Sequence, residues 1–478
     1  MNKSIRFAAI FSLLLVTVLL ANLTVIQAFS EDKYAQNPHN RRAFLETQTI
    51  ARGQIYAGGT VLAQSTADAE GLYSRSYPET SPAFSDVTGY LSDQFGAAGL
   101  EASYNDVLNG KDDSLLARNW LDTLAGKQTA GANVEVTIDP ALQQLAYDEL
   151  NNQGYEGAAV AIQPSTGKIL AMASSPSYSA AAVADPATGA DTWAALQNQP
   201  GNPLVNHATQ ETLPPGSIFK IITTAAGLNN GFAPDSTLTG QNEITLPDGV
   251  TTLTNYGNQM CGGATSVTLE TAFALSCNTA FVDMETQFGG EELGKYATAF
   301  GVGQDYDLGV ESSAGNLGDL SDTSAAAQSA IGQRDVAMSA LQAAVMAGTI
   351  ANKGVRMTPY LVNKVTDATM EDVRVTQPKA AATAVTEDVA ATITDLMFRS
   401  EQYTYGYDGN GFASKTGTAE HGDGLPPHTW YVAFDPDKDI AVGVVVKNGG
   451  HLGEAATGGQ VSSLIGRAIL RAYTGGAQ

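Results

Sequence analysis

The sequence contains few cysteines, histidines and basic residues. Its 478 residues include only two cysteines and five histidines. They form no CxxC motif and show no histidine spacing typical of metal ligands, so we expect neither a metal site nor thiol catalysis. Basic residues are also scarce, since 25 Lys and Arg stand against 49 Asp and Glu, a net charge of −24. Nucleic acids and anionic lipids are bound through Lys and Arg, so this balance argues against both as partners of the protein body.

One apolar run at the N-terminus is long enough to cross a membrane. It covers residues 7–29 and would span roughly 34 Å as a helix. Lys3 and Arg6 precede it without any acidic residue, so the positive-inside rule predicts a cytoplasmic N-terminus. The alternative is a cleaved signal peptide, which would have a shorter apolar stretch and a small-x-small exit; residues 26–28 fit that exit poorly. We therefore expect residues 1–30 to form a cytoplasmic tip and an uncleaved anchor, with the remainder outside the cytoplasm.

The two cysteines fit an exported chain, where disulfides can form. A bridge between Cys261 and Cys277 would close a short loop and stabilise the fold by on the order of 3 kcal/mol. Two unpaired thiols are the alternative that the sequence leaves open.

The chain after the anchor has room for two or three domains, and its pattern changes near residue 133. Residues 31–130 contain short strand-like pieces between glycine turns, and the clearest apolar run is TVLAQ at 60–64. This part has no cluster of candidate catalytic residues. We predict that it forms a small, non-catalytic interaction module and that residues 131–478 form a second domain.

The second domain begins with strand and hairpin patterns. Residues 134–138 alternate like a strand, and Asp139-Pro140 supplies a cap and a first-turn proline for a helix. Residues 157–175 have the pattern of a β-hairpin that turns at Pro164–Gly167. The next long stretch, 217–352, is rich in Ala and Gly and is mostly helical by its period.

The C-terminal part returns to strands. Residues 430–436 and 439–448 predict a second hairpin, and residues 461–473 predict a final helix. Hairpins at both ends with helices between them predict one α+β domain whose sheet joins the two ends.

A serine and a lysine one helical turn apart form the first candidate catalytic pair. Ser217 and Lys220 lie in LPPGSIFK at 213–220, where the prolines and glycine let the serine stand at a helix start. The lysine amine could then take the proton when the hydroxyl attacks a carbonyl. It can do so only if burial and a second cation lower its pKa. The same spacing recurs at Ser165 and Lys168, but within the predicted hairpin turn.

Two further motifs follow this pair along the chain. Ser276 and Asn278 flank a cysteine, and in an extended segment both side chains would point into one cleft. The serine could relay a proton between Lys220 and an amine, while the asparagine could hydrogen-bond a substrate amide through its carbonyl and its NH2 group. Each of these spacings is common by chance, whereas their joint occurrence in an exported chain is not.

The last motif is Lys415-Thr416-Gly417-Thr418. It has the pattern of a strand edge at which glycine lets a substrate approach the backbone closely. Its lysine and hydroxyl groups suit a carboxylate. Lys415 could also be the cation that lowers the pKa of Lys220.

These three motifs resemble the signatures of the serine penicillin-recognising enzymes, Ser-x-x-Lys, Ser-Asp-Asn and Lys-Thr-Gly. Cys277 in the middle motif is similar to high-molecular-weight penicillin-binding proteins rather than to β-lactamases. Further segments resemble the class B penicillin-binding proteins, most of all their short actinobacterial members: residues 52–55, 99–101, 331–333, 341–342, 351–354, 430 and 434–436. Arg334 departs from this pattern, because the family often has glycine there.

The resemblance implies a penicillin-binding/β-lactamase-like transpeptidase fold for residues 131–478, with a central, mostly antiparallel sheet flanked by helices. It implies a D,D-transpeptidase that cross-links peptidoglycan stem peptides. Ser217 would attack the penultimate D-Ala carbonyl with Lys220 as base, and the backbone N–H groups of Ser217 and Thr418 would hold the oxyanion. Ser276 would pass the proton to the leaving D-Ala, whose carboxylate Lys415, Thr416 and Thr418 would hold.

The resemblance also implies that an amine of a neighbouring stem peptide resolves the acyl-enzyme and that β-lactams acylate Ser217. One amide replaces another, so no cofactor is expected. A β-lactamase shares the motifs but needs neither anchor nor module, a D,D-carboxypeptidase differs only in accepting water, and a catalytically idle penicillin sensor or scaffold should have lost a motif residue. By family analogy, the module at residues 31–130 is expected to dock a membrane-embedded glycan polymerase.

Overall fold

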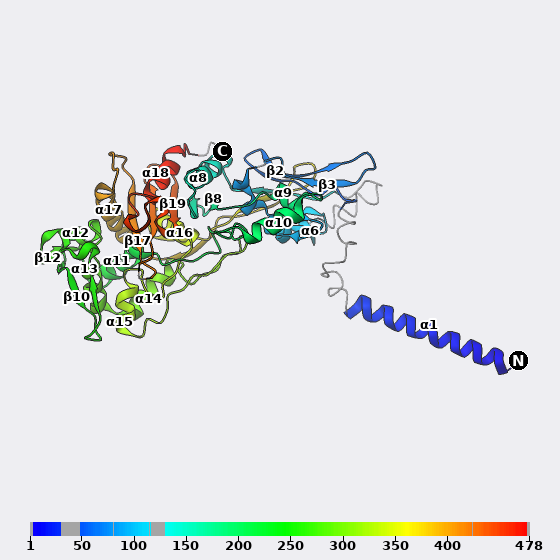
Figure 1. Ribbon diagram of the computed structural model, residues 1–478, viewed down its shortest axis with the longest axis horizontal. Coiled ribbons are helices and arrows are strands. Elements are labelled where there is room, and N and C mark those ends of the chain that lie inside the picture. Colours follow the sequence, from blue (N-terminus) through cyan, green and yellow to red (C-terminus); the bar gives the residue numbers. More distant parts are fainter. Residues whose placement is uncertain are drawn as a thin grey trace.

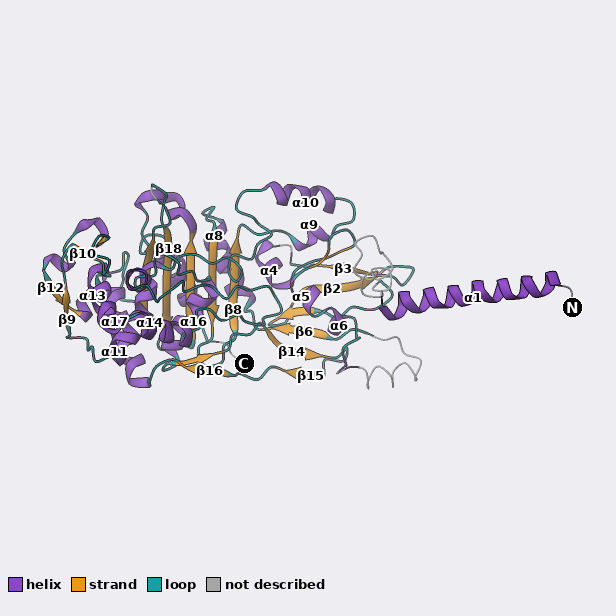
Figure 2. Ribbon diagram, turned by 90° about the horizontal axis from the view of Figure 1, so that it is seen from below, coloured by secondary structure: helices purple, strands orange, loops and turns teal. Residues whose placement is uncertain are grey.

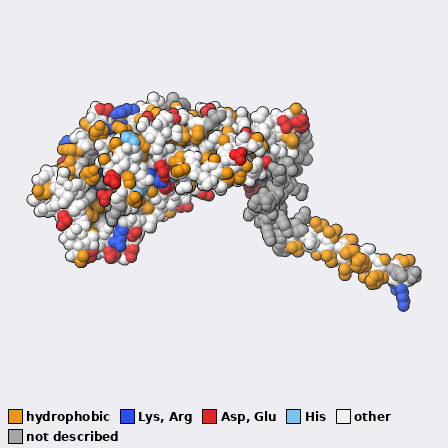
Figure 3. Space-filling model, viewed as in Figure 1, with side chains coloured by type: hydrophobic (Ala, Val, Ile, Leu, Met, Phe, Trp, Pro, Cys, Tyr) orange, Lys and Arg blue, Asp and Glu red, His pale blue; other side chains and the backbone are white. Residues whose placement is uncertain are grey.

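The computed structural model describes residues 3–29, 48–79, 81–113, 115, 130–422 and 424–475. One helix in this part of the chain, α1 (Lys3–Phe29), is long and apolar enough to cross a membrane, with a mean hydropathy of 2.4 over Ile5–Val25. Apolar side chains follow its surface and none of this window is buried (Figure 3). Length and composition therefore agree with the predicted anchor.

A five-stranded antiparallel sheet forms the centre of the larger domain, and it joins the two ends of that domain as predicted (Figure 2). Both predicted hairpins are confirmed, since β7 pairs with β8 and β18 pairs with β19. The pairing of β19 with β7 joins the two hairpins into one open sheet, and β17 forms one of its edges. The strand order is β17 (Ala413–Ala419), β18 (His428–Asp435), β19 (Ile440–Val446), β7 (Gly157–Ile162) and β8 (Ile169–Ser175).

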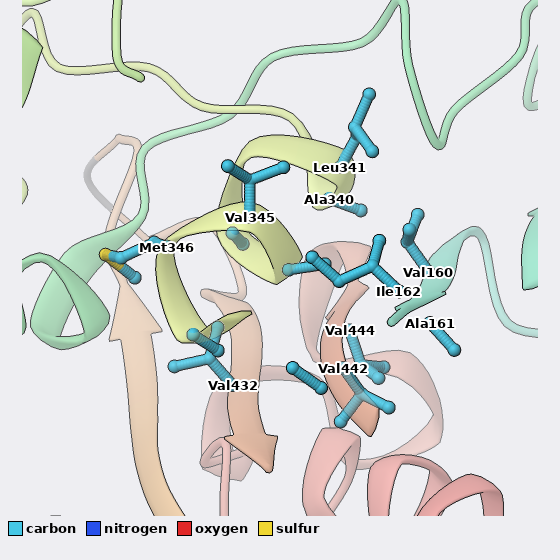
Figure 4. Packing of buried hydrophobic residues seen from close by; sticks show 14 of the residues in the cluster. Val160, Ala161, Ile162, Ala340, Leu341, Val345, Met346, Val432, Val442 and Val444 are labelled. Carbon is cyan, nitrogen blue, oxygen red and sulfur yellow. The ribbon is translucent and has the colours of Figure 1, made fainter. Parts of the chain in front are cut away.

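Helices cover both faces of this sheet. On one face α16 (Ala340–Ala351) lies so close that a Cβ added to Gly443 would be 2.5 Å from the backbone nitrogen of Ala344. On the other face α18 (Ser462–Ala472) packs at Gly466 against Tyr431 and Val442, beside α8 (Pro140–Asn151). Neighbouring strand residues point to opposite faces, so Val442 and Gly443 separate the two layers. Figure 4 shows buried apolar side chains of α16 and of the strands that it covers, with Val442 and Val444 among them.

The N-termini of α8 and α16 both have capping side chains, and the sequence predicts the one at α8. Asp139 accepts hydrogen bonds from the backbone nitrogens of Ala141 and Leu142 at the start of α8. Ser339 and Gln342 form a capping box at the start of α16. These bonds satisfy amides that the first helical turn leaves without partners.

A mainly helical lobe lies beside the β17 edge (Figure 1). Its helices are α11 (Lys220–Asn229), α12 (Leu269–Ala274), α13 (Asn278–Phe288), α14 (Gly290–Ala299), α15 (Thr323–Ser329) and α17 (Glu387–Tyr403). The expectation of helix is wrong for residues 237–268, which form the paired strands β9 (Thr237–Thr239) with β12 (Ser266–Thr268) and β10 (Glu243–Thr245) with β11 (Thr252–Thr254). The β-branched threonines and the Pro-Asp-Gly turn of this segment favour strands over helix.

A second, six-stranded sheet lies nearer the N-terminus and draws on distant parts of the chain. Its order is β15 (Asp372–Val375), β14 (Val362–Thr366), β6 (Asn133–Val136), β1 (Ile55–Ala57), β2 (Thr60–Ala67) and β3 (Tyr73–Ser76). The predicted boundary at residue 131 therefore passes through one sheet, because β6, β14 and β15 follow that residue. Where the two domains divide stays a prediction.

The remaining elements are short. Around the six-stranded sheet lie α4 (Ser85–Thr88), β4 (Leu91–Ser92), β5 (Gly96–Ala97), α5 (Gly99–Ser103), α6 (Asn105–Leu108), α9 (Ala180–Ala184) and α10 (Gly189–Asn198). The pair β13 (Val355–Met357) and β16 (Ala380–Thr383) lies beside α16.

Candidate functional site

Ser217 lies in a tight helical turn that leads into α11. This turn, η2 (Gly216–Phe219), is a 3-10 helix, and Lys220 begins the α-helix that continues it. Two hydrogen bonds to backbone carbonyls hold the residues before Ser217: the Trp430 indole Nε1 donates to the Pro214 carbonyl at 2.8 Å, and the Gly216 amide donates to the Gly332 carbonyl at 2.9 Å. The predicted placement of serine and lysine one turn apart is thus what the structure contains.

Arg334 has a backbone conformation that favours glycine. Its φ is +63°, in the left-handed region that residues with a Cβ rarely adopt. Gly332, two residues earlier, lies directly against the backbone of Gly216. The Arg334 side chain is half exposed and forms an ion pair with Asp335 at 3.5 Å.

Lys220 is completely buried, and its amine contacts Ser276 and Asn278 of the second motif. Nζ donates to the Asn278 side-chain oxygen at 2.8 Å and to the Ser276 carbonyl at 2.7 Å, and it lies 3.3 Å from Ser276 Oγ. Among the residues that the structure describes, no carboxylate forms an ion pair with it. All of its polar contacts are with neutral oxygens.

This environment lowers the pKa of Lys220 well below the usual value for lysine. The main cause is burial, which disfavours the charged ammonium, and the second is repulsion from Lys415. Burial also lowers the pKa of Lys415 to about 7. Lys220 can act as a base only if burial and a nearby second cation lower its pKa, and the folded protein provides both.

Ser276 lies between the two lysines. Its Oγ accepts a hydrogen bond from Lys415 Nζ at 2.9 Å, and Lys220 Nζ lies on its other side. A hydroxyl that contacts two amines can accept a proton from one group while it donates its own to another. This arrangement is suited to proton relay.

The backbone around Ser276 differs from the extended segment that the sequence predicts. Ser276 has a φ of +60°, Cys277 is the residue before the helix, and Asn278 is the first residue of α13. The helix start, rather than strand alternation, brings the two side chains to Lys220. The Asn278 NH2 group also donates to the Thr254 carbonyl at 3.1 Å, so both ends of this amide contact protein atoms and the side chain holds Lys220 in place.

Cys261 and Cys277 form a disulfide across a sequence separation of 16 residues. It links the loop after β11 to the residue next to Ser276. Because Ser276 has a left-handed backbone conformation, this covalent link adds a restraint where the chain has an uncommon geometry.

The Lys415–Thr418 motif lies in the edge strand β17, as its pattern predicts. The reason for its glycine is different from the expected one. A Cβ added to Gly417 would be 2.7 Å from the Pro215 carbonyl and 3.1 Å from the Ile218 side chain. Glycine here allows the Ser217 turn itself, and not only a substrate, to approach the strand.

A cleft of about 520 Å³ opens beside β17. Ser276, Thr416 and Thr418 line it, together with Tyr403 and Tyr405 at the end of α17. These tyrosines lie outside the three sequence motifs. The signal that could have found them is the aromatic run YTYGY at 403–407, close before the lysine motif.

Comparison with known proteins is consistent with this site. Residues 157–471 match the family model of the penicillin binding protein transpeptidase domain, and residues 52–134 match that of the penicillin binding protein A dimerisation domain. The chain is 43% identical to the peptidoglycan D,D-transpeptidase PbpA of Mycolicibacterium smegmatis, over 99% of both chains. Penicillin-binding protein A from M. tuberculosis, solved as a ceftriaxone acyl-enzyme complex, is 40% identical with a TM-score of 0.85, covering 90% of this chain and 100% of that one.

The lysine pair predicts the pH dependence of acylation by a β-lactam. Lys220 must be neutral to accept a proton, so the rate should rise with pH and level off far below the usual lysine pKa. Replacing the second cation, Lys415→Met, removes a cause of the lowered pKa, so the rising limb should move to higher pH. The measurement is the acylation rate constant against pH, with exposed Lys353→Met as control. An unchanged limb in Lys415→Met would contradict the coupling.

The disulfide predicts sensitivity to reduction. The double variant Cys261→Ser/Cys277→Ser should lose about 3 kcal/mol of unfolding free energy. Denaturant unfolding with and without dithiothreitol tests this, because the reductant should destabilise the wild type and leave the double variant unaffected. Equal stability of both proteins without reductant would show that the bridge does not restrain the fold.

Proposed function

The chain belongs to the class B penicillin-binding proteins, and from this membership we propose that it cross-links peptidoglycan as a D,D-transpeptidase through an acyl-enzyme at Ser217. The observation that carries the proposal is the buried Lys220 amine. It lies one turn from Ser217, contacts Ser276 and Asn278, and lacks a carboxylate partner among the described residues.

The first half of the reaction forms an ester. Ser217 Oγ attacks the carbonyl carbon of the penultimate D-Ala of a stem peptide, and neutral Lys220 takes the hydroxyl proton. The negative charge that develops on the carbonyl oxygen is held by the backbone N–H groups of Ser217 and Thr418. The close packing of η2 against β17 at Gly216 and Gly417 supports this assignment.

Departure of the terminal D-Ala needs a proton on its nitrogen. Lys220, now charged, passes its proton through Ser276, whose Oγ lies 3.3 Å from Nζ. The C–N bond breaks, D-Ala leaves as the amine, and the donor remains on Ser217 as an ester. Lys220 is neutral again and ready for the second half.

The carboxylate of the terminal D-Ala is held at β17. Thr416 and Thr418 supply hydroxyl groups that line the cleft, and Lys415 supplies a charge. Since burial lowers the pKa of Lys415 to about 7, the free site is only partly charged at neutral pH. A bound carboxylate favours the ammonium form and gives Lys415 its ion-pair partner.

The second half reverses these steps with a new amine. An amine of a neighbouring stem peptide attacks the ester carbonyl and loses a proton through Ser276 to Lys220. Ser217 departs and recovers a proton from Lys220, so a new amide replaces the old one with no net change in charge or oxidation state. β-Lactams acylate Ser217 by the first half alone.

Apolar α1 supports a membrane location, and we propose that the N-terminus is cytoplasmic and the catalytic domain extracytoplasmic, because Lys3 and Arg6 precede the apolar run. The N-terminal module at residues 31–130 is proposed to dock a membrane-embedded glycan polymerase. A glycosyltransferase that co-purifies with the full chain should be lost when this module is deleted. If the glycosyltransferase still co-purifies after the deletion, the module does not dock it.

Covalent labelling by a fluorescent penicillin tests the catalytic assignment. Ser217→Ala should lose the label, and Lys220→Met should slow labelling by about 10²- to 10⁴-fold, the usual contribution of a general base. The chain offers a matched control in Ser165→Ala and Lys168→Met, which have the same spacing but lie in the β7–β8 turn. These controls should label like the wild type. Label retained by Ser217→Ala would refute the assignment.

A further inference from the structure

The cleft beside Ser276 is lined by uncharged side chains alone. None of its fifteen lining residues is Asp, Glu, Lys or Arg, although 15% of the chain is charged. Two larger hollows differ: the one of about 1280 Å³ is lined by Asp86, Asp305, Asp307 and Glu311, and the one of about 560 Å³ has seven charged side chains. A third, of about 550 Å³ beside Phe232 and Phe288, is also uncharged. The cleft beside Ser276 is thus a neutral area on a strongly acidic protein.

Three tyrosines give this cleft aromatic walls. Tyr256, Tyr403 and Tyr405 line it, and their side chains are 70%, 68% and 64% exposed. No residue that the structure describes hydrogen-bonds their hydroxyl groups. Tyrosine rings that stand free in a cleft offer flat apolar faces and a polar, neutral edge, which suit an uncharged polar group.

The two lysines nearest this cleft are buried and are not among its lining residues. Lys220 and Lys415 are buried and contact Ser276, and the terminal carboxylate of the donor requires Lys415. A second carboxylate on the donor would find no cation in the lining. It would lose hydration without an ion-pair partner, which is costly, whereas a carboxamide of the same shape can hydrogen-bond to hydroxyl and amide groups.

From this lining we infer that the enzyme selects donors whose residue before the D-Ala-D-Ala pair ends in a neutral carboxamide rather than a carboxylate. The inference rests on the proposed function and names the donor class of the same site. Gln460, whose side-chain oxygen accepts from Thr457 Oγ1 at 2.9 Å, and the three tyrosines form the surface that discriminates.

Matched thioester donors test this. The pair N-acetyl-L-Gln-D-Ala-thioglycolate and N-acetyl-L-Glu-D-Ala-thioglycolate differs only in the charge of one side chain, and both keep the terminal carboxylate. With the full chain in detergent, kcat/KM for the Gln donor should exceed that for the Glu donor by about tenfold to a hundredfold. Equal values would overturn the inference.

Measurements at high salt distinguish an effect of the cleft lining from repulsion by the net negative charge of the protein. Repulsion from the net charge of −24 is long-ranged and screened at 1 M salt, whereas an unpaired charge inside the cleft is not. The preference should therefore persist at 1 M salt. If it disappears there, long-range repulsion is the cause and the inference fails.

Two lysine variants, one inside the lining and one outside it, test whether the lining causes the donor preference. Gln460→Lys adds a cation to the lining and should raise kcat/KM for the Glu donor, reducing the preference at least fivefold. Gln402→Lys makes the same change on exposed α17 surface outside the lining and should leave the preference unchanged. Identical effects of both variants would contradict the inference.

Penicillin labelling tests the proposed function independently of the donor preference. Labelling that does not depend on Ser217 would refute the proposed function. A wild type that labels at Ser217 but shows no preference, or accepts neither thioester, would leave the proposed function standing and overturn the inferred donor class.

Discussion

The buried amine of Lys220 is the constraint on which the catalytic arrangement depends. Its contacts with Ser276 and Asn278 join η2 and α11 to the start of α13, and Ser276 carries the connection on to Lys415 in β17. Two lysines share one hydroxyl in a site where the described residues supply no carboxylate. Burial lowers the pKa of both amines, and repulsion from Lys415 lowers that of Lys220 further, which favours the neutral form that a base requires.

Close backbone packing brings these elements together. Glycine at 417 lets β17 approach Pro215 and Ile218, and glycine at 332 lets a distant loop lie against Gly216. The central sheet holds β17 in place from behind, since Gly443 admits α16 onto one face and Gly466 admits α18 onto the other. The site is therefore positioned by the absence of side chains as much as by their presence.

Charge is distributed in a way that follows from this arrangement. The chain carries an excess of carboxylates on its surface, yet the cleft beside Ser276 is neutral and aromatic. A neutral lining keeps the protein's own carboxylates away from Lys220, where an acidic neighbour would raise the pKa of this amine and favour its charged form. It also leaves Lys415 free to pair with the terminal carboxylate of the donor.

The sequence by itself determined the candidate catalytic motifs, the hairpins at 157–175 and 430–448, the apolar N-terminal helix and the α+β class, because spacing, periodicity and capping are local properties that a chain carries with it. It could not determine the left-handed turn at Ser276, the reason for Gly417, the strands within 237–268 or the tyrosine walls. Nor could it show that β14 and β15 complete a sheet begun by β1. These features depend on contacts between segments far apart in the chain, and the pKa of Lys220 is one of them: only the folded protein buries that amine beside Lys415.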